Sequence, residues 1–249
     1  MRTKQLSDAV AVVSEEQKQV TVEQKAFKRF IDQIIEIDTG QNGQIYFQPK
    51  SSAVNSSQSA NNSCQKIITI YDETVVNVPR YEAVYDEPLD IHLGAELGEE
   101  IRTALTTSQS LTPQLKQAVL QAGKREWDAR KQLLQDLNTE HDQLTEAAVS
   151  IREIRQGLRE IQQLLHRDPS FDELHPVYET LHEYETRTNS WIEEHQHHIQ
   201  TTSRKHPRSE NYAFHEYLYR DCSTQYPLLA AYTSLIAEIT TVNGQIARA

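Results

Sequence analysis

The chain has 249 residues, with 36 acidic and 25 basic side chains and a formal net charge of −11 at pH 7. This surplus of negative charge disfavours contact with phosphate backbones, so nucleic acid is not an expected partner. Hydrophobic residues make up 37% of the chain. That fraction is below the roughly 45–50% of globular domains and favours narrow apolar seams between helices.

The beginning of the chain, MRTKQLSDAVAVVSEEQK, holds only a short apolar patch. No run approaches the roughly 20 apolar residues that a membrane-spanning helix needs. We therefore expect no signal peptide, no membrane partner and a cytoplasmic location. The cysteines, Cys64 and Cys222, have no neighbouring cysteine at metal-ligand spacing, which excludes a zinc knuckle or a disulfide framework.

The first predicted element is an amphipathic helix over residues 6–38. Spacings of three and four place one stripe of apolar or neutral residues on it: Val10, Val13, Gln17, Val20, Gln24, Phe27, Ile31 and Ile34. A tract rich in Ser, Asn and Gln follows at 41–65. Its few apolar residues cannot offset the entropy of ordering, which predicts a flexible linker.

Prolines and tyrosines mark the next segment, 67–108. A proline disfavours helical geometry at the residue before it, so the segment is predicted to be helical but kinked. This corner either wraps over the end of a helical bundle or presents a surface to a partner protein. The residues of that possible partner surface are Tyr71, Pro79, Tyr81, Tyr85 and Pro88.

The strongest pattern starts at Thr112 and Pro113, which suit the cap and first position of a helix. No helix breaker follows until about His166. A heptad seam runs along this helix: Leu133, Leu137, Glu140, Leu144, Ala147, Ile151, Ile154, Leu158, Ile161 and Leu165.

A second heptad helix begins after a short turn, where Ser170 and Glu173 match a capping box. Its seam consists of Phe171, Leu174, Tyr178, Leu181, Glu185, Thr188, Ile192, His195 and Ile199. The turn is too short for a crossover, so residues 113–203 are predicted to form an antiparallel coiled-coil hairpin. Trp191 and other flanking residues widen the stripe, which predicts contact with a third helix.

A final helix is predicted over 209–247, from apolar residues spaced like those of the earlier helices. Together these elements predict an all-α fold. We expect residues 1–249 to form a single elongated helical bundle with a long antiparallel coiled-coil hairpin and a proline-kinked corner.

Two Glu-x-x-His pairs, Glu179 with His182 and Glu194 with His197, have the spacing of di-iron bundle ligands. They lie on one helix about 22 Å apart, given a rise of 1.5 Å per residue, and so cannot share a dinuclear centre. We expect a solvated face here. A weak transition-metal site at Glu194, His197 and His198 is the alternative.

Polar residues occupy several seam positions: Gln17, Gln24, Glu140, Glu185 and His195. One interpretation is a buried catalytic carboxylate with a raised pKa. The one we favour is a polar layer that sets helix register, or a seam locally open to water. The sequence contains no phosphate-binding loop or nucleophile elbow. We therefore assign no catalytic, cofactor or metal residue and expect the protein not to be an enzyme.

Three stretches carry a resemblance to a family: YDETVVNVPRYEAVYDEPLDIHLGAELG, LTPQLKQAVL and YRDCSTQYPLLAAY. They resemble blocks of an uncharacterised family of haloarchaeal helical proteins of unknown function, and the resemblance spans most of the chain. That family has no assigned activity, so it carries over no functional residue. It implies a salt-rich cytoplasm, with which the acidic surplus agrees.

These observations predict a non-enzymatic coiled-coil protein that acts through protein–protein interaction, either with another protein or by self-association into a homo-oligomer. No cofactor is expected. The alternative is a metal-binding helical bundle that uses the helix rich in Glu and His.

Overall fold

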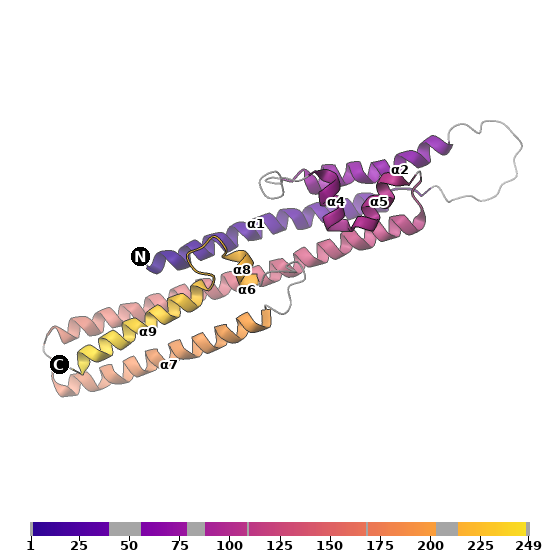
Figure 1. Cartoon of the computed structure of the whole chain (residues 1–249). Coiled ribbons are helices and arrows are strands. Elements are labelled where there is room, and N and C mark those ends of the chain that lie inside the picture. The colour runs from indigo at the N-terminus through magenta and orange to yellow at the C-terminus, as the bar shows by residue number, and fades with distance from the viewer. Residues whose placement is uncertain are drawn as a thin grey trace, which may run out of the picture. The chain divides into compact units, whose positions relative to one another are not determined.

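A computed structural model describes residues 2–39, 56–78, 88–108, 110–167, 169–202 and 214–247. All regular structure in these ranges is helical, which confirms the all-α prediction. The elements are α1 (Arg2–Ile35), α2 (Ser56–Tyr71), the π-helical turn η1 (Asp72–Val76), α4 (Leu89–Leu97), α5 (Glu99–Thr107), α6 (Pro113–Leu165), α7 (Phe171–Thr202), α8 (Phe214–Leu218) and α9 (Pro227–Ile246) (Figure 1). Among the described residues, no helix is both long and apolar enough to cross a membrane.

The chain forms two compact units rather than the single unit predicted for residues 1–249. Met1–Gln17 and Gln135–Ala249 make up the first, here called the hairpin unit. Lys18–Leu134 make up the second, here called the corner unit. The helices α1 and α6 each contribute residues to both units.

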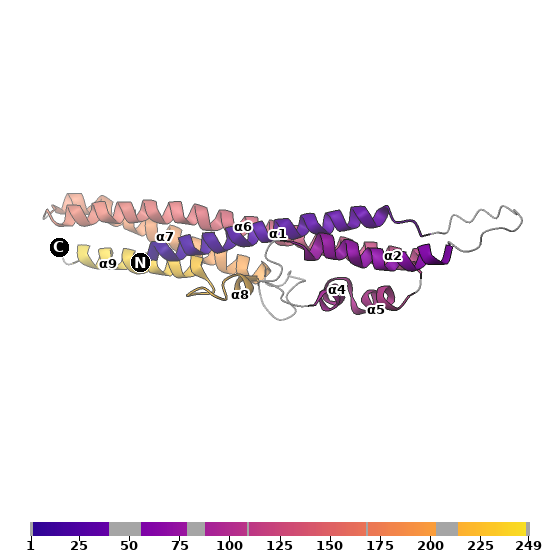
Figure 2. The same ribbon diagram turned by 90° about the horizontal axis from the view of Figure 1, so that it is seen from above.

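In the hairpin unit, α6 and α7 run antiparallel and α9 lies beside α7 (Figures 1 and 2). Every predicted seam position of α6 from Leu137 to Ile161 is buried, and Leu165 is half-buried. The ring of Tyr184 on α7 packs closely over Gly157 on α6. The periodicity of α6 therefore identified its buried face correctly.

The seam of α7 is only partly covered. Leu181, Thr188 and His195 are buried, whereas Phe171 is 82% exposed and Tyr178 is 58% exposed. Phe171 and Tyr178 lie in the first turns of α7, which begins at Phe171. The predicted seam is thus wrong at the beginning of α7.

A third helix does contact α7, as the wide stripe predicted. The rings of Trp191 on α7 and Tyr232 on α9 lie with centroids 5.6 Å apart. On the other side, Arg155 of α6 binds Glu238 of α9 through both carboxylate oxygens, at 2.9 and 2.8 Å. These contacts make α9 the third helix of the hairpin unit.

The C-terminal segment, predicted as one helix over 209–247, contains two. The short α8 is separated from α9 by residues 219–226, and residues 209–213 lie outside the described ranges. Pro227 opens α9, because a proline suits a first helical position but disfavours helix at the preceding residue. Of the apolar positions predicted for α9, Ile246 is half-buried and the others are buried: Leu228, Tyr232, Leu235, Ile239 and Val242.

Both predicted helix starts are confirmed. The Thr112 hydroxyl accepts a hydrogen bond from the backbone N–H of Leu115 at 3.1 Å, just before α6. Before α7, the backbone N–H of Ser170 donates to the Glu173 carboxylate at 2.8 Å. Each contact satisfies a backbone donor that the helix leaves free.

The corner unit has its own apolar core. Buried members include Phe27, Phe30, Ile34, Cys64, Ile67, Ile70, Tyr71, Leu93, Leu97, Leu105 and Val119. The linker predicted over 41–65 is wrong from Ser56 onward, where α2 begins. Burial of Cys64 and Ile67 against the core stabilises a helix that the polar composition alone did not predict.

The predicted kinks in 67–108 take a different form. The end of α2 widens into the π-helical turn η1, whereas Pro79 lies outside the described residues. Pro88 immediately precedes α4, in the extended geometry expected of a helix boundary. A further break occurs at Gly98, whose φ of 103° favours glycine, and it separates α4 from α5.

Candidate functional site

A buried polar layer crosses the hairpin unit at Glu140. Its carboxylate accepts a hydrogen bond from the Tyr219 hydroxyl at 2.6 Å and lies 3.2 Å from Nε2 of His215. The ring of His195 on α7 packs edge-to-face against the ring of His215, with centroids 6.0 Å apart. All four side chains are buried, so this layer joins α6, α7 and α8 through polar contacts.

The electrostatics of this layer keep Glu140 ionised. Burial by itself raises the pKa of Glu140. Its neighbours outweigh this effect and lower the pKa below its usual value, through the hydrogen bond and charge of His215, the hydrogen bond of Tyr219 and the charge of His195. Burial lowers the pKa of His195 to about 4, despite the opposing charge of Glu140. Burial and the same carboxylate raise the pKa of Tyr219. A carboxylate that acts as a general acid near neutral pH would instead need a raised pKa.

The heptad pattern predicted Glu140 and His195 as polar seam positions, but it did not point to His215 or Tyr219. The missed pair lies four residues apart, at and just after α8, and therefore on one helical face. Among the other polar seam positions, Gln17 donates to Asn138 at 2.7 Å. These contacts agree with the register-setting interpretation.

A cavity of about 300 Å³ opens beside the layer, between α6, α7 and α9 of the hairpin unit. We call it the aromatic pocket. The side chains important for its chemistry are Gln143, Glu146, Trp191, Glu194, His195 and Tyr232. Burial, followed by the charges of Glu194 and Glu146, raises the pKa of Tyr232 to about 12. The two carboxylates therefore create a negative field in the pocket.

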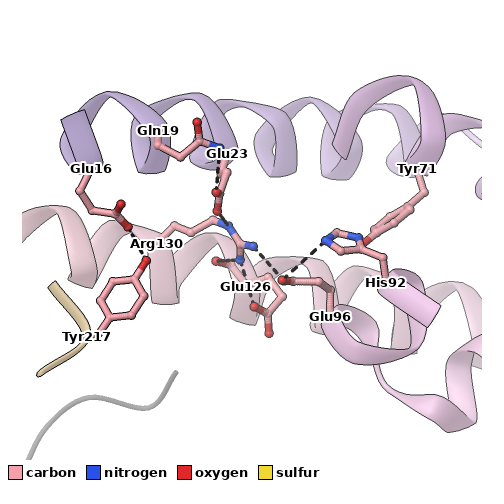
Figure 3. A network of polar contacts seen from close by, with 9 residues as sticks. All are labelled: Glu16, Gln19, Glu23, Tyr71, His92, Glu96, Glu126, Arg130 and Tyr217. Atoms are coloured by element: carbon pink, nitrogen blue, oxygen red, sulfur yellow. Dashed lines mark hydrogen bonds and ion pairs between the residues drawn. The ribbon is translucent and has the colours of Figure 1, made fainter. Parts of the chain in front are cut away.

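The corner unit contains a second buried polar cluster, centred on Arg130 of α6 (Figure 3). The guanidinium lies 3.0 Å from Glu23, 2.8 Å from Glu96 and 3.0 Å from Glu126. Its Cζ also lies 4.1 Å from the centre of the Phe27 ring. Arg130 thus joins α1, α4 and its own helix, and the forked shape of its guanidinium allows one side chain to do so.

Three carboxylates surround this one guanidinium, so their charges are not fully balanced. Burial, together with the charge and hydrogen bond of Glu96, raises the pKa of Glu126 against the opposing effect of Arg130. Near Glu96, the Tyr71 hydroxyl and Nδ1 of His92 lie 2.8 Å apart (Figure 3). The cluster is suited to holding helices in register rather than to exposing a reactive group.

Of the five residues predicted as a partner surface, the structure describes two, Tyr71 and Pro88. Tyr71 is fully buried and packs edge-on against Phe30, with ring centroids 5.4 Å apart. It cannot contact a partner because the apolar core covers it. Pro88 is exposed at the start of α4. Pro79, Tyr81 and Tyr85 lie outside the described residues.

The Glu/His-rich face of α7 does not gather into a centre. Glu179, His182, Glu194 and His197 are exposed and His198 is half-buried. Within the described ranges, no three His, Cys, Asp or Glu side chains are placed to share a metal ion.

The fold and its polar layers define a class: an all-α protein of long packed helices whose buried polar residues connect the helices. The family model described as "Domain of unknown function (DUF7260)" matches residues 4–243. The chain therefore belongs to this family. Neither a search of the curated proteins nor a search of the solved structures found a match.

Proposed function

We propose that the protein is non-enzymatic and acts through protein–protein contact, and that the partner at its hairpin is a second copy of the same chain. The observation that carries this proposal is the uncovered start of α7. Phe171 and Tyr178 lie seven residues apart on one helical face, 82% and 58% exposed. Adjacent large apolar groups left in water at seam positions are typical of an association surface.

The charges around this stripe favour a second copy as the occupant. On α7, Asp172 and Glu179 follow the two aromatic residues directly and are exposed. Arg159 and Arg167, near the end of α6, are also exposed, and neither forms an ion pair with another described residue. The hairpin tip consists of the end of α6 and the start of α7, and it carries all four of these charges. Two copies whose tips are related by a two-fold axis can place the acidic residues of one copy against the basic residues of the other.

The energetics rest mainly on the aromatic side chains. Full burial of one such side chain contributes about 2 kcal/mol, and a two-fold interface buries each of them twice. Exposed ion pairs contribute only about 0–1 kcal/mol each. We infer that apolar burial provides most of the affinity and that the charges select the partner and its orientation.

This balance suits the haloarchaeal cytoplasm that the sequence resemblance implies. Molar salt screens charges beyond a few ångströms but does not weaken apolar burial. We therefore propose association that persists in molar salt.

Light scattering coupled to size-exclusion chromatography tests the proposal with the double variant Phe171→Ser/Tyr178→Ser. The matched control is Ile35→Ser/Ile91→Ser, because both isoleucines are 53% exposed and lie outside the hairpin unit. We expect the first variant to be monomeric and the control to keep the wild-type mass. Loss of association in both variants, or in neither, contradicts the proposed surface.

A further inference from the structure

The aromatic pocket has the features of a ligand site and is independent of the proposed self-association. Its volume of about 300 Å³ is at the lower end of small-molecule sites. Trp191 and Tyr232 form one wall, with an angle of 31° between their rings. Such a wall offers apolar contact and a negative π face.

The charge of the pocket selects for cations. Glu146 on α6 and Glu194 on α7 both line it, and in the described part of the chain neither is in an ion pair with Lys or Arg. Glu194 accepts only a hydrogen bond from Ser190, at 3.2 Å. The guanidinium of Arg187 already lies 5.3 Å from the centre of the Trp191 ring. A cation is favoured at such a position over an indole ring.

Two polar groups of the wall can accept hydrogen bonds from a ligand. His195 is 5% exposed and lines the pocket, so its imidazole is available to a molecule bound there. Oε1 of Gln143 is buried and has no hydrogen-bond partner among the described residues. Leaving the Gln143 oxygen unsatisfied costs free energy, which a ligand with a suitable donor would recover.

The hydrogen-bonding capacity of these groups identifies the ligand class. A neutral imidazole offers one acceptor, the Gln143 oxygen a second, and the two carboxylates several more. An ammonium group has three donors and no acceptor. A bare metal ion fits less well, since the described residues form no cluster of three metal-ligating side chains.

We propose that the aromatic pocket binds a primary ammonium group attached to an apolar chain, with the ammonium between Glu146 and Glu194 and the chain against Trp191 and Tyr232. A free alkylamine and the lysine side chain of a partner protein share this chemistry. His195 and Gln143 act as neutral hydrogen-bond acceptors for the ammonium group.

The test uses tryptophan fluorescence. The chain has two tryptophans, so Trp127→Phe leaves Trp191 as the reporter. Pentylamine is titrated into this protein at pH 7, with n-pentanol as the uncharged probe of similar shape. We expect a saturable change with pentylamine and at least about tenfold weaker binding of pentanol, because the alcohol lacks the charge.

Glu146→Gln/Glu194→Gln, made in the same background, keeps the shape of the pocket and removes its charge. Glu153→Gln/Glu193→Gln is the control, since these two exposed carboxylates lie on the same helices but do not line the pocket. We expect about tenfold weaker amine binding in the first variant and unchanged binding in the control. Absence of saturable binding, equal affinity for pentanol, or equal losses in both variants overturns the proposal.

A second amine probe distinguishes the two sources. Nα-acetyl-lysine-N-methylamide carries the same ammonium chain on a peptide backbone. Binding at least as tight as that of pentylamine supports the site and assigns it to a lysine of a partner protein. Weaker binding, with pentylamine still saturable, supports the site and assigns it to a free amine.

Discussion

The hydroxyl oxygen of Tyr219 lies 2.6 Å from Oε1 of Glu140, and both side chains are 0% exposed. The tyrosine follows α8, whereas the glutamate occupies the middle of the α6 seam. This buried contact ties the turn between α8 and α9 to the longest helix of the chain. It also helps to keep a carboxylate ionised inside an otherwise apolar seam.

Tyr219→Phe removes the hydroxyl donor and leaves the buried carboxylate with one fewer hydrogen bond. A hydrogen bond to a charged group contributes about 1.5–3 kcal/mol, so we expect the free energy of unfolding to fall by about 2 kcal/mol. Urea titration followed by circular dichroism measures the change. Tyr217→Phe is the control, because its hydroxyl donates to Glu16 at an exposed site. If the two variants lose equal free energy of unfolding, the buried hydrogen bond contributes no more to stability than the exposed one.

The stability of the hairpin unit should depend on pH through His195. Burial lowers the pKa of His195 from 6.5 to about 4, so the unfolded chain binds a proton at a pH where the folded chain does not. Stability is therefore full above pH 6.5 and falls as the pH drops from 6.5 towards 4. Unfolding at pH 7 and pH 5 should show a larger loss for the wild type than for His195→Gln. Equal losses would mean that His195 does not titrate in this window.

Arg130 makes the corner unit sensitive to a change that conserves charge. Lysine keeps the positive charge but cannot reach Glu23, Glu96 and Glu126 together, because an ammonium lacks the fork of a guanidinium. Breaking a buried ion pair costs about 3–5 kcal/mol, and we expect Arg130→Lys to approach this range in chemical denaturation. Arg125→Lys, at an exposed position of the same helix, should change stability little. Similar stabilities for the two variants would refute a role for the three-way contact.

Two glycines provide a test of the packing between α6 and α7. A Cβ at Gly157 would overlap the Tyr184 hydroxyl oxygen and lie 3.1 Å from two carbons of its ring, whereas at Gly244 it would meet nothing within 4 Å. Alanine is favoured over glycine in helices by about 1 kcal/mol. We expect Gly244→Ala to raise the melting temperature and Gly157→Ala to lower it. If both substitutions stabilise the protein, the ring of Tyr184 does not pack over Gly157.

The buried face of α6 was predictable because a heptad repeat is local information. Leu137 to Ile161 follow it without interruption, and the structure buries all the predicted positions in that range. The same pattern failed at Phe171 and Tyr178, since periodicity shows which residues share a face but not whether another helix covers that face. The helical start of α2 was missed because tertiary burial of Cys64 and Ile67 outweighed a polar composition.

The polar clusters were harder to foresee. Glu23 and Arg130 are 107 residues apart, and nothing near either one in the sequence points to the other. Glu140 stood out because it interrupts an apolar seam, but its partners His215 and Tyr219 come from a short helix and turn without a repeat. Tyr71 appeared to belong to a surface because prolines follow it, yet Phe27, Phe30 and His92 surround it.

The charges at the hairpin tip allow a test by reversal. Asp172→Lys/Glu179→Lys should make the protein monomeric at low salt, because like charges would then face each other across the proposed interface. Adding Arg159→Glu/Arg167→Glu should restore association by exchanging the signs. The masses of the double and quadruple variants decide this point. A quadruple variant that stays monomeric while remaining helical would contradict the proposed pairing.

The central claim is self-association through the start of α7. Its most direct test is the mass of the wild-type chain, measured by light scattering over a range of concentrations at low and at molar salt. We predict a species of twice the chain mass that persists in molar salt and dissociates only on dilution. A monomer at every concentration and in both salts would contradict the account.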